Sequence, residues 1–320
     1  MKKTTLQPSS TCALNEQIGA NKVVAFNVGP SGEVCLVIAL KPLDYQTESN
    51  GLARFPKVVP ASPQQYRILI VHAGELDLDL RIDQEPLNIH NIQPLGENIL
   101  LTCSRSEYRG PGDFDHNARV YGRDGTFLRD FLLGDGIETI QATRHGEIWA
   151  SYFDEGIFGN LGWNEPVGAS GLVAWSSTGE KSYEYEPEGS AEYISDCYAL
   201  NVTTDEDVWC YYYTDFPLVH LHKKRITSIW HIPVNGSSAF AVENDHALFS
   251  GGYNDRDTFQ LVRLNAQDNA TRIGQFQLLD GQGDVVEVER VVGRGSTLYI
   301  LSKGALHEIS LGELVAKRRR

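Results

Sequence analysis

Polar side chains that could do chemistry recur at the ends of short apolar runs, which come in pairs along this 320-residue chain. Converging carboxylates could hold a hard cation such as Ca²⁺ or Mg²⁺, or act as general acid and base. Solvated strand ends of an acidic protein would show the same pattern, so both interpretations stay open. The candidates after second runs are Arg105, Asp154, Asp215 and Asp255, and those beginning first runs are His90, Glu138, Asp196, Tyr198 and Glu289.

Other catalytic signatures are missing from the sequence. It holds no GxSxG nucleophile elbow, P-loop, HExxH pair or dinucleotide-binding glycine fingerprint. His220 and His222 fall on the same side of a predicted strand, a spacing that fits either a metal pair or two surface histidines. The five cysteines are odd in number and lack CxxC spacing, which favours buried thiols in a reducing cytoplasm over a disulfide framework.

Charge and hydropathy argue against two classes of protein. The chain has 28 Lys and Arg against 42 Asp and Glu, a net charge of −14, whereas nucleic-acid binding needs a basic surface. No apolar run approaches the roughly 20 residues of a membrane span, and the basic N-terminus lacks the apolar stretch of a secretory signal. The negative charge suits a basic partner, such as a nuclease-like toxin domain or a basic regulator.

The elements that must position these residues follow from an internal repeat. Two apolar runs joined by a polar turn recur six times, and five copies are followed by a second hairpin of alternating character. Gly74, Gly125 and Gly179 fall at tips of the second hairpins, where a positive φ is needed. A spacing of about 53 residues is typical of a kelch-like propeller blade. The first hairpins span 23–38, 89–103, 137–152, 197–212, 239–253 and 288–302.

We therefore predict an all-β fold: a single six-bladed β-propeller domain over 1–320, built from four-stranded antiparallel blades. The last copy is followed only by the run at 305–311, one strand short, so residues 1–18 are predicted to supply the strand that closes the blade at 285–314. The predicted blades are approximately 19–87, 88–135, 136–189, 190–234, 235–284 and 285–314, followed by a frayed basic tail at 315–320.

A family resemblance rests on the turns of these repeats. GEIW-type turns in the first hairpins and xDGxF-type turns in the second resemble bacterial propellers with NHL and two-component-regulator repeats. The segment 135–159, DGIETIQATRHGEIWASYFDEGIFG, together with DCYALN at 196–201 and YYYTDFPLV at 211–219, resembles a bacterial propeller family of unknown function. The resemblance implies the fold and no activity, because repeat signatures do not specify chemistry.

Unequal loops predict which end of the blades is functional. In an antiparallel meander, the connections between second and third strands all emerge at one end. Three of them are long, at 40–66, 104–117 and 154–170, and loops of this length are usually functional or disordered. The third carries Phe158 and Trp163 among glycines, so both rings are predicted to contact a partner or to fold down against neighbouring blades. Trp149 and Trp209 occupy equivalent repeat positions and are predicted to be buried core residues.

These observations favour a non-catalytic binding scaffold that presents the long-loop face to a protein or ligand, with no cofactor evident. The alternative is a metal-assisted hydrolase or lyase with His90 as base and a divalent cation in the central channel. The candidate binding residues are His90, Arg105, Glu138, Asp154, Phe158, Trp163, Asp196, Tyr198, Asp215 and Asp255. A metal would be held by several of Glu138, Asp154, Asp196, Asp215 and Asp255.

Overall fold

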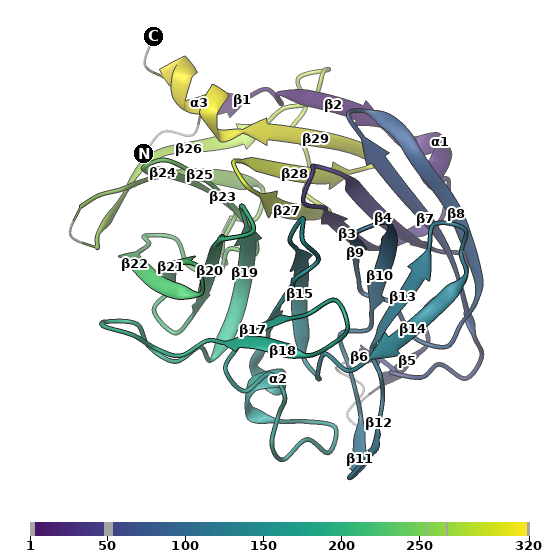
Figure 1. The fold of residues 1–320 in the computed structure, drawn as a ribbon. Helices are drawn as coiled ribbons and strands as arrows, with labels where there is room; N and C mark the ends of the chain where they lie inside the picture. The colour runs from purple at the N-terminus through teal and green to yellow at the C-terminus, as the bar shows by residue number, and fades with distance from the viewer. Residues whose placement is uncertain (1–3, 48–53, 254, 267, 319–320) are drawn as a thin grey trace. The chain divides into compact units, whose positions relative to one another are not determined.

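The computed structural model describes residues 4–47, 54–253, 255–266 and 268–318 (Figure 1). Six main sheets follow one another along the chain, and apart from two N-terminal strands that join the last two sheets, the strands of each sheet are antiparallel and in sequence order. This is the predicted all-β, six-bladed β-propeller fold. The chain divides into two compact units of three sheets each. We call them the 18–185 unit and the 186–320 unit, the second of which also contains residues 1–17.

The 18–185 unit contains three four-stranded sheets. The first has β3 (Lys22–Val28), β4 (Val34–Ala39), β7 (Gln64–His72) and β8 (Glu75–Glu85). The second has β9 (Asn91–Leu95), β10 (Asn98–Thr102), β13 (Ala118–Gly122) and β14 (Phe127–Phe131). The third has β15 (Ile137–Ala142), β16 (Ile148–Tyr152), β17 (Leu172–Trp175) and β18 (Lys181–Glu184). The loops between second and third strands contain β5 (Tyr45–Thr47), β6 (Arg54–Pro56), β11 (Tyr108–Gly110), β12 (Asp113–Phe114) and α2 (Asp154–Phe158).

The 186–320 unit contains the other three sheets. The first has β19 (Asp196–Val202), β20 (Asp207–Tyr213), β21 (Pro217–His222) and β22 (Arg225–His231). The second has β23 (Phe240–Glu243), β24 (His246–Ser250), β25 (Thr258–Leu264) and β26 (Ala270–Leu278). The third has β27 (Arg290–Arg294), β28 (Thr297–Ser302) and β29 (Ala305–Ser310).

The N-terminal strand closes the last sheet as predicted. Strand β2 (Ser10–Ala13) pairs antiparallel with β29, with Ser10 opposite Glu308 and Ala13 opposite Ala305. A second N-terminal strand was not predicted: β1 (Thr4–Leu6) pairs parallel with β26 and makes that sheet five-stranded. The short helix α1 (Asn15–Ile18) follows β2. The N-terminal segment therefore covers the open edges of two sheets rather than one.

Burial along the strands agrees with the hydrophobic pattern. Every residue of β4 is buried, whereas β8 alternates between buried or half-buried and exposed positions over most of its length. The hairpin-tip glycines Gly74, Gly125 and Gly179 have φ of 82°, 86° and 87°, a region that a residue with Cβ rarely adopts. Local turn chemistry and alternation thus fix the hairpins before any long-range contact is considered.

The two equivalent tryptophans have different environments. Trp149 is 1% exposed and is among the largest fully buried side chains, as predicted. The same prediction for Trp209 is wrong, because that side chain is only partly buried. Its ring stacks on His220 at a centroid distance of 4.0 Å and on Trp230 at 5.6 Å. Trp209 lies at the hairpin end of β20, where these two rings cover it in place of a closed core.

The C-terminus is more ordered than predicted. Residues Leu311–Arg318 form helix α3, with Leu311 and Leu314 buried. The Arg318 guanidinium donates a hydrogen bond to the Ile273 carbonyl at 2.8 Å and lies 5.7 Å from the Phe276 ring. A cation in the last turn is also favourable for the helix dipole. The predicted frayed tail is therefore wrong for 315–318, while 319–320 lie outside the described residues.

Candidate functional site

Within the 18–185 unit, the three long loops emerge on one side (Figure 1). Two of them, 104–117 and 154–170, are fastened together. The Tyr108 N–H donates to the Leu161 carbonyl at 2.8 Å, and the Trp163 indole donates to the Ser106 carbonyl at 2.8 Å. The Trp163 ring lies 4.9 Å from the Tyr108 ring and 5.8 Å from the Phe114 ring. These contacts build the two loops into one surface, which we call the loop face.

A close backbone approach between two glycines sets the position of the loop at 154–170. Gly136 has a φ of 70°, and a Cβ there would lie 2.3 Å from the backbone nitrogen of Gly156 in α2. The Phe153 N–H donates to the Gly136 carbonyl at 2.9 Å. Any larger side chain at either glycine would push α2 away from the start of β15. The sequence DGIE before the third repeat carries this signal, although the partner glycine cannot be found from it.

The predicted site residue Arg105 holds the base of the loop face. Its guanidinium makes two hydrogen bonds to the Asp135 carboxylate, at 2.8 and 3.0 Å, and an ion pair with Glu155 at 2.6 Å. The same carboxylate accepts the Ser106 N–H at 2.9 Å. Arg105 and Asp135 are both buried. Because these charges satisfy one another, Arg105 positions the loops, and Asp135 is a residue that sequence reasoning missed.

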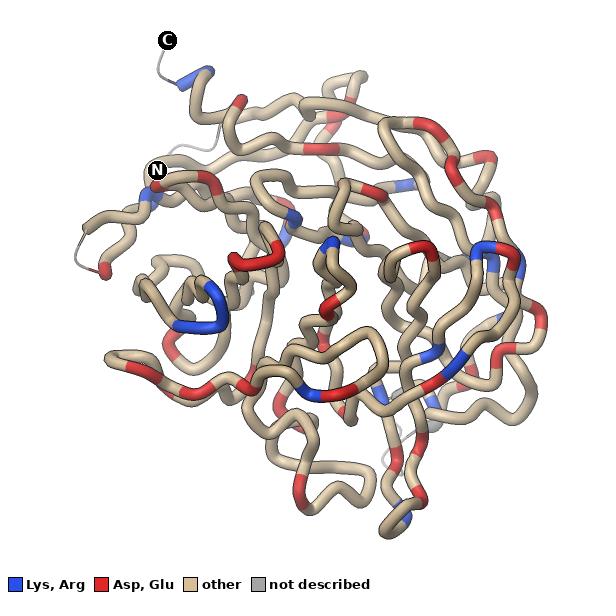
Figure 2. The backbone as a smooth tube through the Cα atoms, viewed as in Figure 1, with Lys and Arg blue, Asp and Glu red and all other residues tan. Residues whose placement is uncertain are grey.

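Phe158 and Trp163 lie in the same loop but differ in their exposure to solvent. Trp163 is only 8% exposed and folds down, the second of the two predicted alternatives. Phe158, the last residue of α2, is 70% exposed. Asp154 begins the same helix and is also exposed, with its carboxylate accepting the Glu155 N–H at 2.8 Å. The loop face therefore presents the exposed ring of Phe158 on the same short helix as the exposed Asp154. Acidic positions are spread along the backbone of the chain (Figure 2).

His90 is a poor general base in this structure. Its Nδ1 accepts the Ser104 N–H at 3.1 Å, and its Nε2 is buried without a hydrogen-bond partner among the described residues. Burial, with a smaller contribution from the Arg105 charge, lowers the pKa of His90 to about 4. A histidine with so low a pKa is neutral and weakly basic at neutral pH, so its role is to complete the turn after β10.

This burial predicts an acid-dependent loss of stability. A histidine with a lowered pKa in the folded state contributes stability that is present above its unfolded pKa of about 6.5 and is lost as pH falls toward 4. Between pH 7.5 and 5 the loss should be about 2 kcal/mol. The His90→Asn variant keeps an acceptor for Ser104 and does not titrate, so urea unfolding should show a smaller acid loss. Equal losses in the two proteins would contradict this assignment.

The acidic candidates are distributed over both units. In the 18–185 unit, Glu138 is exposed on β15 and Asp154 is exposed on α2; in the other unit, Asp215 is exposed and Asp196 and Asp255 are half-buried. No group of three or more His, Cys, Asp or Glu side chains among the described residues is arranged to hold a metal ion. His220 and His222 instead share the Asp207 carboxylate, each at 2.9 Å. The structure therefore gives the metal-assisted alternative no supporting geometry within its described residues.

Tyr198 belongs to an aromatic cluster whose other members include Tyr213 and Tyr253, which stand two residues before Asp215 and Asp255. The Tyr198 and Tyr253 hydroxyls are hydrogen-bonded to each other, and both rings pack edge-on against Phe216. Tyr213 also packs against Phe216. Tyr213 and Tyr253 each stand two residues before a predicted aspartate, so the sequence carried this signal, whereas Phe216 as their common centre could not be found from it.

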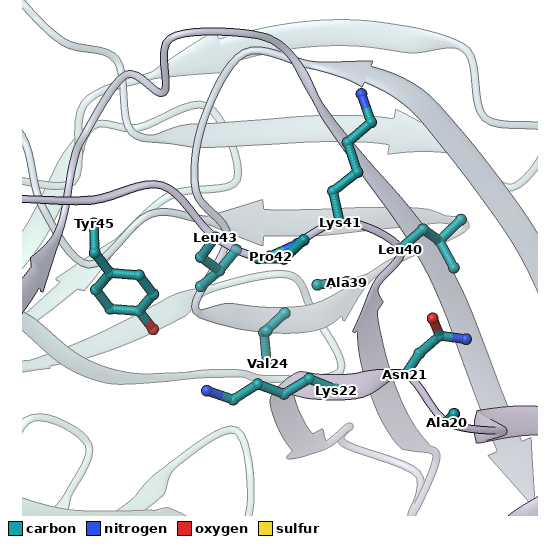
Figure 3. A pocket seen from close by; sticks show the side chains of 10 residues that line it. All are labelled: Ala20, Asn21, Lys22, Val24, Ala39, Leu40, Lys41, Pro42, Leu43 and Tyr45. Atoms are coloured by element: carbon teal, nitrogen blue, oxygen red, sulfur yellow. The ribbon is translucent and has the colours of Figure 1, made fainter.

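A separate pocket of about 310 Å³ lies beside the beginning of β3 and the chain after β4 (Figure 3). Val24 and Leu43 line it with apolar surface, and Lys22 extends below Val24. Lys41 extends away from these residues in the same view. None of the predicted site residues lines this pocket.

Sheets of this number and order, with one end elaborated by long loops, define a β-propeller protein. A sequence model of the YxzG family, whose function is unknown, matches residues 172–308, less than half of the chain. No curated protein matches the chain. Among the described residues, no helix is both long and apolar enough to cross a bilayer.

Two solved structures are similar to this chain. A chain from a crystal structure of the mitotic checkpoint complex is similar at a TM-score of 0.50 and 6% identity, over 97% of this chain and 93% of that one. A catalytically inactive virginiamycin B lyase from Staphylococcus aureus, crystallised with quinupristin, matches at a TM-score of 0.43 and 11% identity. That match covers 94% of this chain and 98% of the lyase chain. At such identities the first similarity shows the fold alone, and the second carries no argument.

Proposed function

We propose that this protein is a non-catalytic binding scaffold whose loop face, in the 18–185 unit, contacts a basic protein. The observation that carries the proposal is Phe158, a 70% exposed aromatic ring on a loop that is fastened to its neighbour. An exposed aromatic side chain on a rigid mount can bury a large apolar area on binding while losing little conformational entropy.

Charge around Phe158 supports the basic character of the partner. Asp154 is exposed at the other end of α2. On the adjacent loop Glu107 and Asp113 are exposed and both form ion pairs with Arg109, which leaves the acidic charges in excess. The whole chain carries a net charge of −14. Complementary charge raises the rate at which the two proteins meet and disfavours acidic partners. Most of the affinity comes from the Phe158 ring, which becomes buried on binding.

The roles of the other candidates follow from their burial. Arg105 and Trp163 hold the loop face in shape, and Phe158 and Asp154 contact the partner.

The cellular location and the origin of the protein belong to the same proposal. A cytoplasmic location is consistent with five cysteines, four of them buried, that are not joined in a disulfide framework. The bacterial origin and the NHL-type repeats stay predictions.

The test uses a panel of purified basic proteins with pI above about 9, matched with acidic proteins of similar size, and measures binding to the full chain by biolayer interferometry. We expect at least one basic protein to bind, with affinity that falls as salt rises. Phe158→Ser should weaken that binding at least about tenfold.

The matched control is Leu128→Ser, which removes a 47% exposed apolar side chain from β14 of the same unit. This control should bind as the unmodified protein does. Equal effects of the two substitutions, or binding of no basic protein in the panel, would contradict the proposed role of the loop face.

A further inference from the structure

Four aromatic rings from three separate segments converge in the 186–320 unit. Tyr213 ends β20, Phe216 immediately precedes β21, Tyr198 lies in β19 and Tyr253 follows β24. The Phe216 ring centroid lies 5.3 Å from that of Tyr198, 5.7 Å from that of Tyr213 and 5.8 Å from that of Tyr253. All three tyrosines meet Phe216 at steep angles, between 63° and 87°. We call this group the tyrosine cluster.

Packing against buried residues holds the cluster in place. Phe216 has a φ of +53°, which a bulky residue adopts only when its surroundings enforce it. Its ring stacks on the buried Tyr211 at 5.3 Å, and the Tyr211 hydroxyl donates to the Val234 carbonyl at 2.6 Å. Tyr253 lies directly on Gly236, where a Cβ would come within 2.6 Å of the ring. The rings are therefore positioned before any ligand arrives.

The outer rings of the cluster are open to solvent and have acidic neighbours. Tyr213 is 44% exposed and Tyr253 is 56% exposed. No Lys or Arg of the described residues lies over either ring. Asp215, between Tyr213 and Phe216 in the chain, is exposed and makes no ion pair or side-chain hydrogen bond with the described part of the protein. The Asp255 carboxylate accepts a hydrogen bond from the Gln275 amide at 3.1 Å.

From this arrangement we propose that the tyrosine cluster binds an organic cation, an alkylammonium or guanidinium group. The faces of aromatic rings carry negative electrostatic potential and attract a cation within about 6 Å of the ring centre. Two exposed tyrosine rings packed on one phenylalanine, with the exposed Asp215 next to that phenylalanine in the chain, favour such a group over an anion or a neutral apolar group. The Tyr198 and Tyr253 hydroxyls already satisfy each other, and Tyr213 and Tyr253 are exposed, so a cation can approach the rings with little desolvation of polar groups.

An organic cation fits the cluster better than a metal ion does. The described residues offer no group of three metal-ligating side chains, and the cluster provides ring faces where a metal needs oxygen, nitrogen or sulfur ligands. The site is also independent of the loop face, because it uses none of the residues that surround Phe158. Failure of the loop-face experiment would leave this proposal standing, and the reverse also holds.

The first experiment compares choline with its uncharged isostere 3,3-dimethylbutan-1-ol, each titrated into the full chain and followed by calorimetry. We expect choline to bind at millimolar concentration and the isostere to bind at least about threefold to tenfold more weakly. Equal binding of the two compounds would overturn the proposal. It would also be overturned if neither choline nor the charged peptides of the final comparison bind at concentrations up to about 10 mM.

Substitutions then locate the site. Tyr253→Leu should weaken cation binding about threefold to tenfold, whereas Tyr253→Phe keeps the ring and should largely retain it. Asp215→Asn should weaken binding and reduce its dependence on salt. Tyr193→Leu is the matched control, since Tyr193 is 81% exposed in the same unit and lies outside the cluster. Binding unchanged in Tyr253→Leu, or reduced equally by Tyr193→Leu, would overturn the assignment.

A final comparison identifies the source of the cation. Capped peptides with a single Lys, Arg or trimethyl-Lys are titrated alongside the same peptide with norleucine at that position. Preference for a charged peptide over choline indicates a side chain of a partner protein, and preference for choline indicates a free small molecule. Both results support the site; equal binding of the norleucine peptide and the charged peptides contradicts it.

Discussion

Deleting residues 1–18 should lower the melting temperature of this protein by about 10 °C or more. The deletion removes both N-terminal strands, exposing the outer edges of β29 and β26. It also removes the buried side chains of Leu6, Leu14 and Ile18, each worth roughly 1.5–3 kcal/mol of apolar burial. The measurement is thermal unfolding followed by circular dichroism in the far ultraviolet.

Rescue in trans gives this prediction its control. A synthetic peptide of residues 4–18 should restore part of the lost melting temperature in a concentration-dependent way, because binding to the folded state stabilises it. A peptide of the same composition in scrambled order should not. A melting curve unchanged by the deletion would show that β1 and β2 contribute no stability to the sheets they join.

Replacing Trp149 with alanine should cost about 3–5 kcal/mol of unfolding free energy. Trp149 is 1% exposed in the middle of β16, with its ring 5.4 Å from that of Tyr183, so truncation leaves a large cavity. Its indole N–H has no hydrogen-bond partner among the described residues. Trp149→Phe therefore removes an unsatisfied donor together with some volume and should cost much less than alanine.

Trp209 supplies the comparison for this series, because it occupies the equivalent repeat position and is only partly buried. Trp209→Ala should cost less than half as much as Trp149→Ala in urea unfolding, since the surrounding rings can close over the space. A larger cost at Trp209 than at Trp149 would contradict the burial assigned to both residues.

Repeats and turns in the sequence determined the architecture. Alternation of apolar residues and glycine at hairpin tips are local signals, and each hairpin such as β7–β8 satisfies them within about 20 residues. The missing last strand was visible for the same reason: 305–311 had no following run, and the N-terminal segment had no local partner. Six blades and the N-terminal closure of the last one could therefore be predicted without any knowledge of side-chain contacts, whereas the added strand β1 could not.

The tertiary structure decided which candidate residues can contact a partner. Arg105 was predicted as part of a polar ring and is instead neutralised by Asp135, 30 positions away, and by Glu155. Trp163 folds down because the Ser106 carbonyl accepts its indole N–H across 57 positions. Charge and aromatic type mark both residues in the sequence, but only the packing of distant loops shows that their functional groups are already satisfied.

Some members of the tyrosine cluster are close in the sequence, and others come together only through packing. Tyr213 and Asp215 are two positions apart in the sequence, at and just after the end of the strand β20. Tyr253 reaches the same point across 55 positions from Tyr198, through a hydrogen bond between their hydroxyls and a glycine that leaves room for its ring. Period and turn chemistry are properties of neighbouring residues, so the blades could be predicted from the sequence. Convergence of side chains depends on how separate sheets and loops pack, so it could be found only in the folded structure.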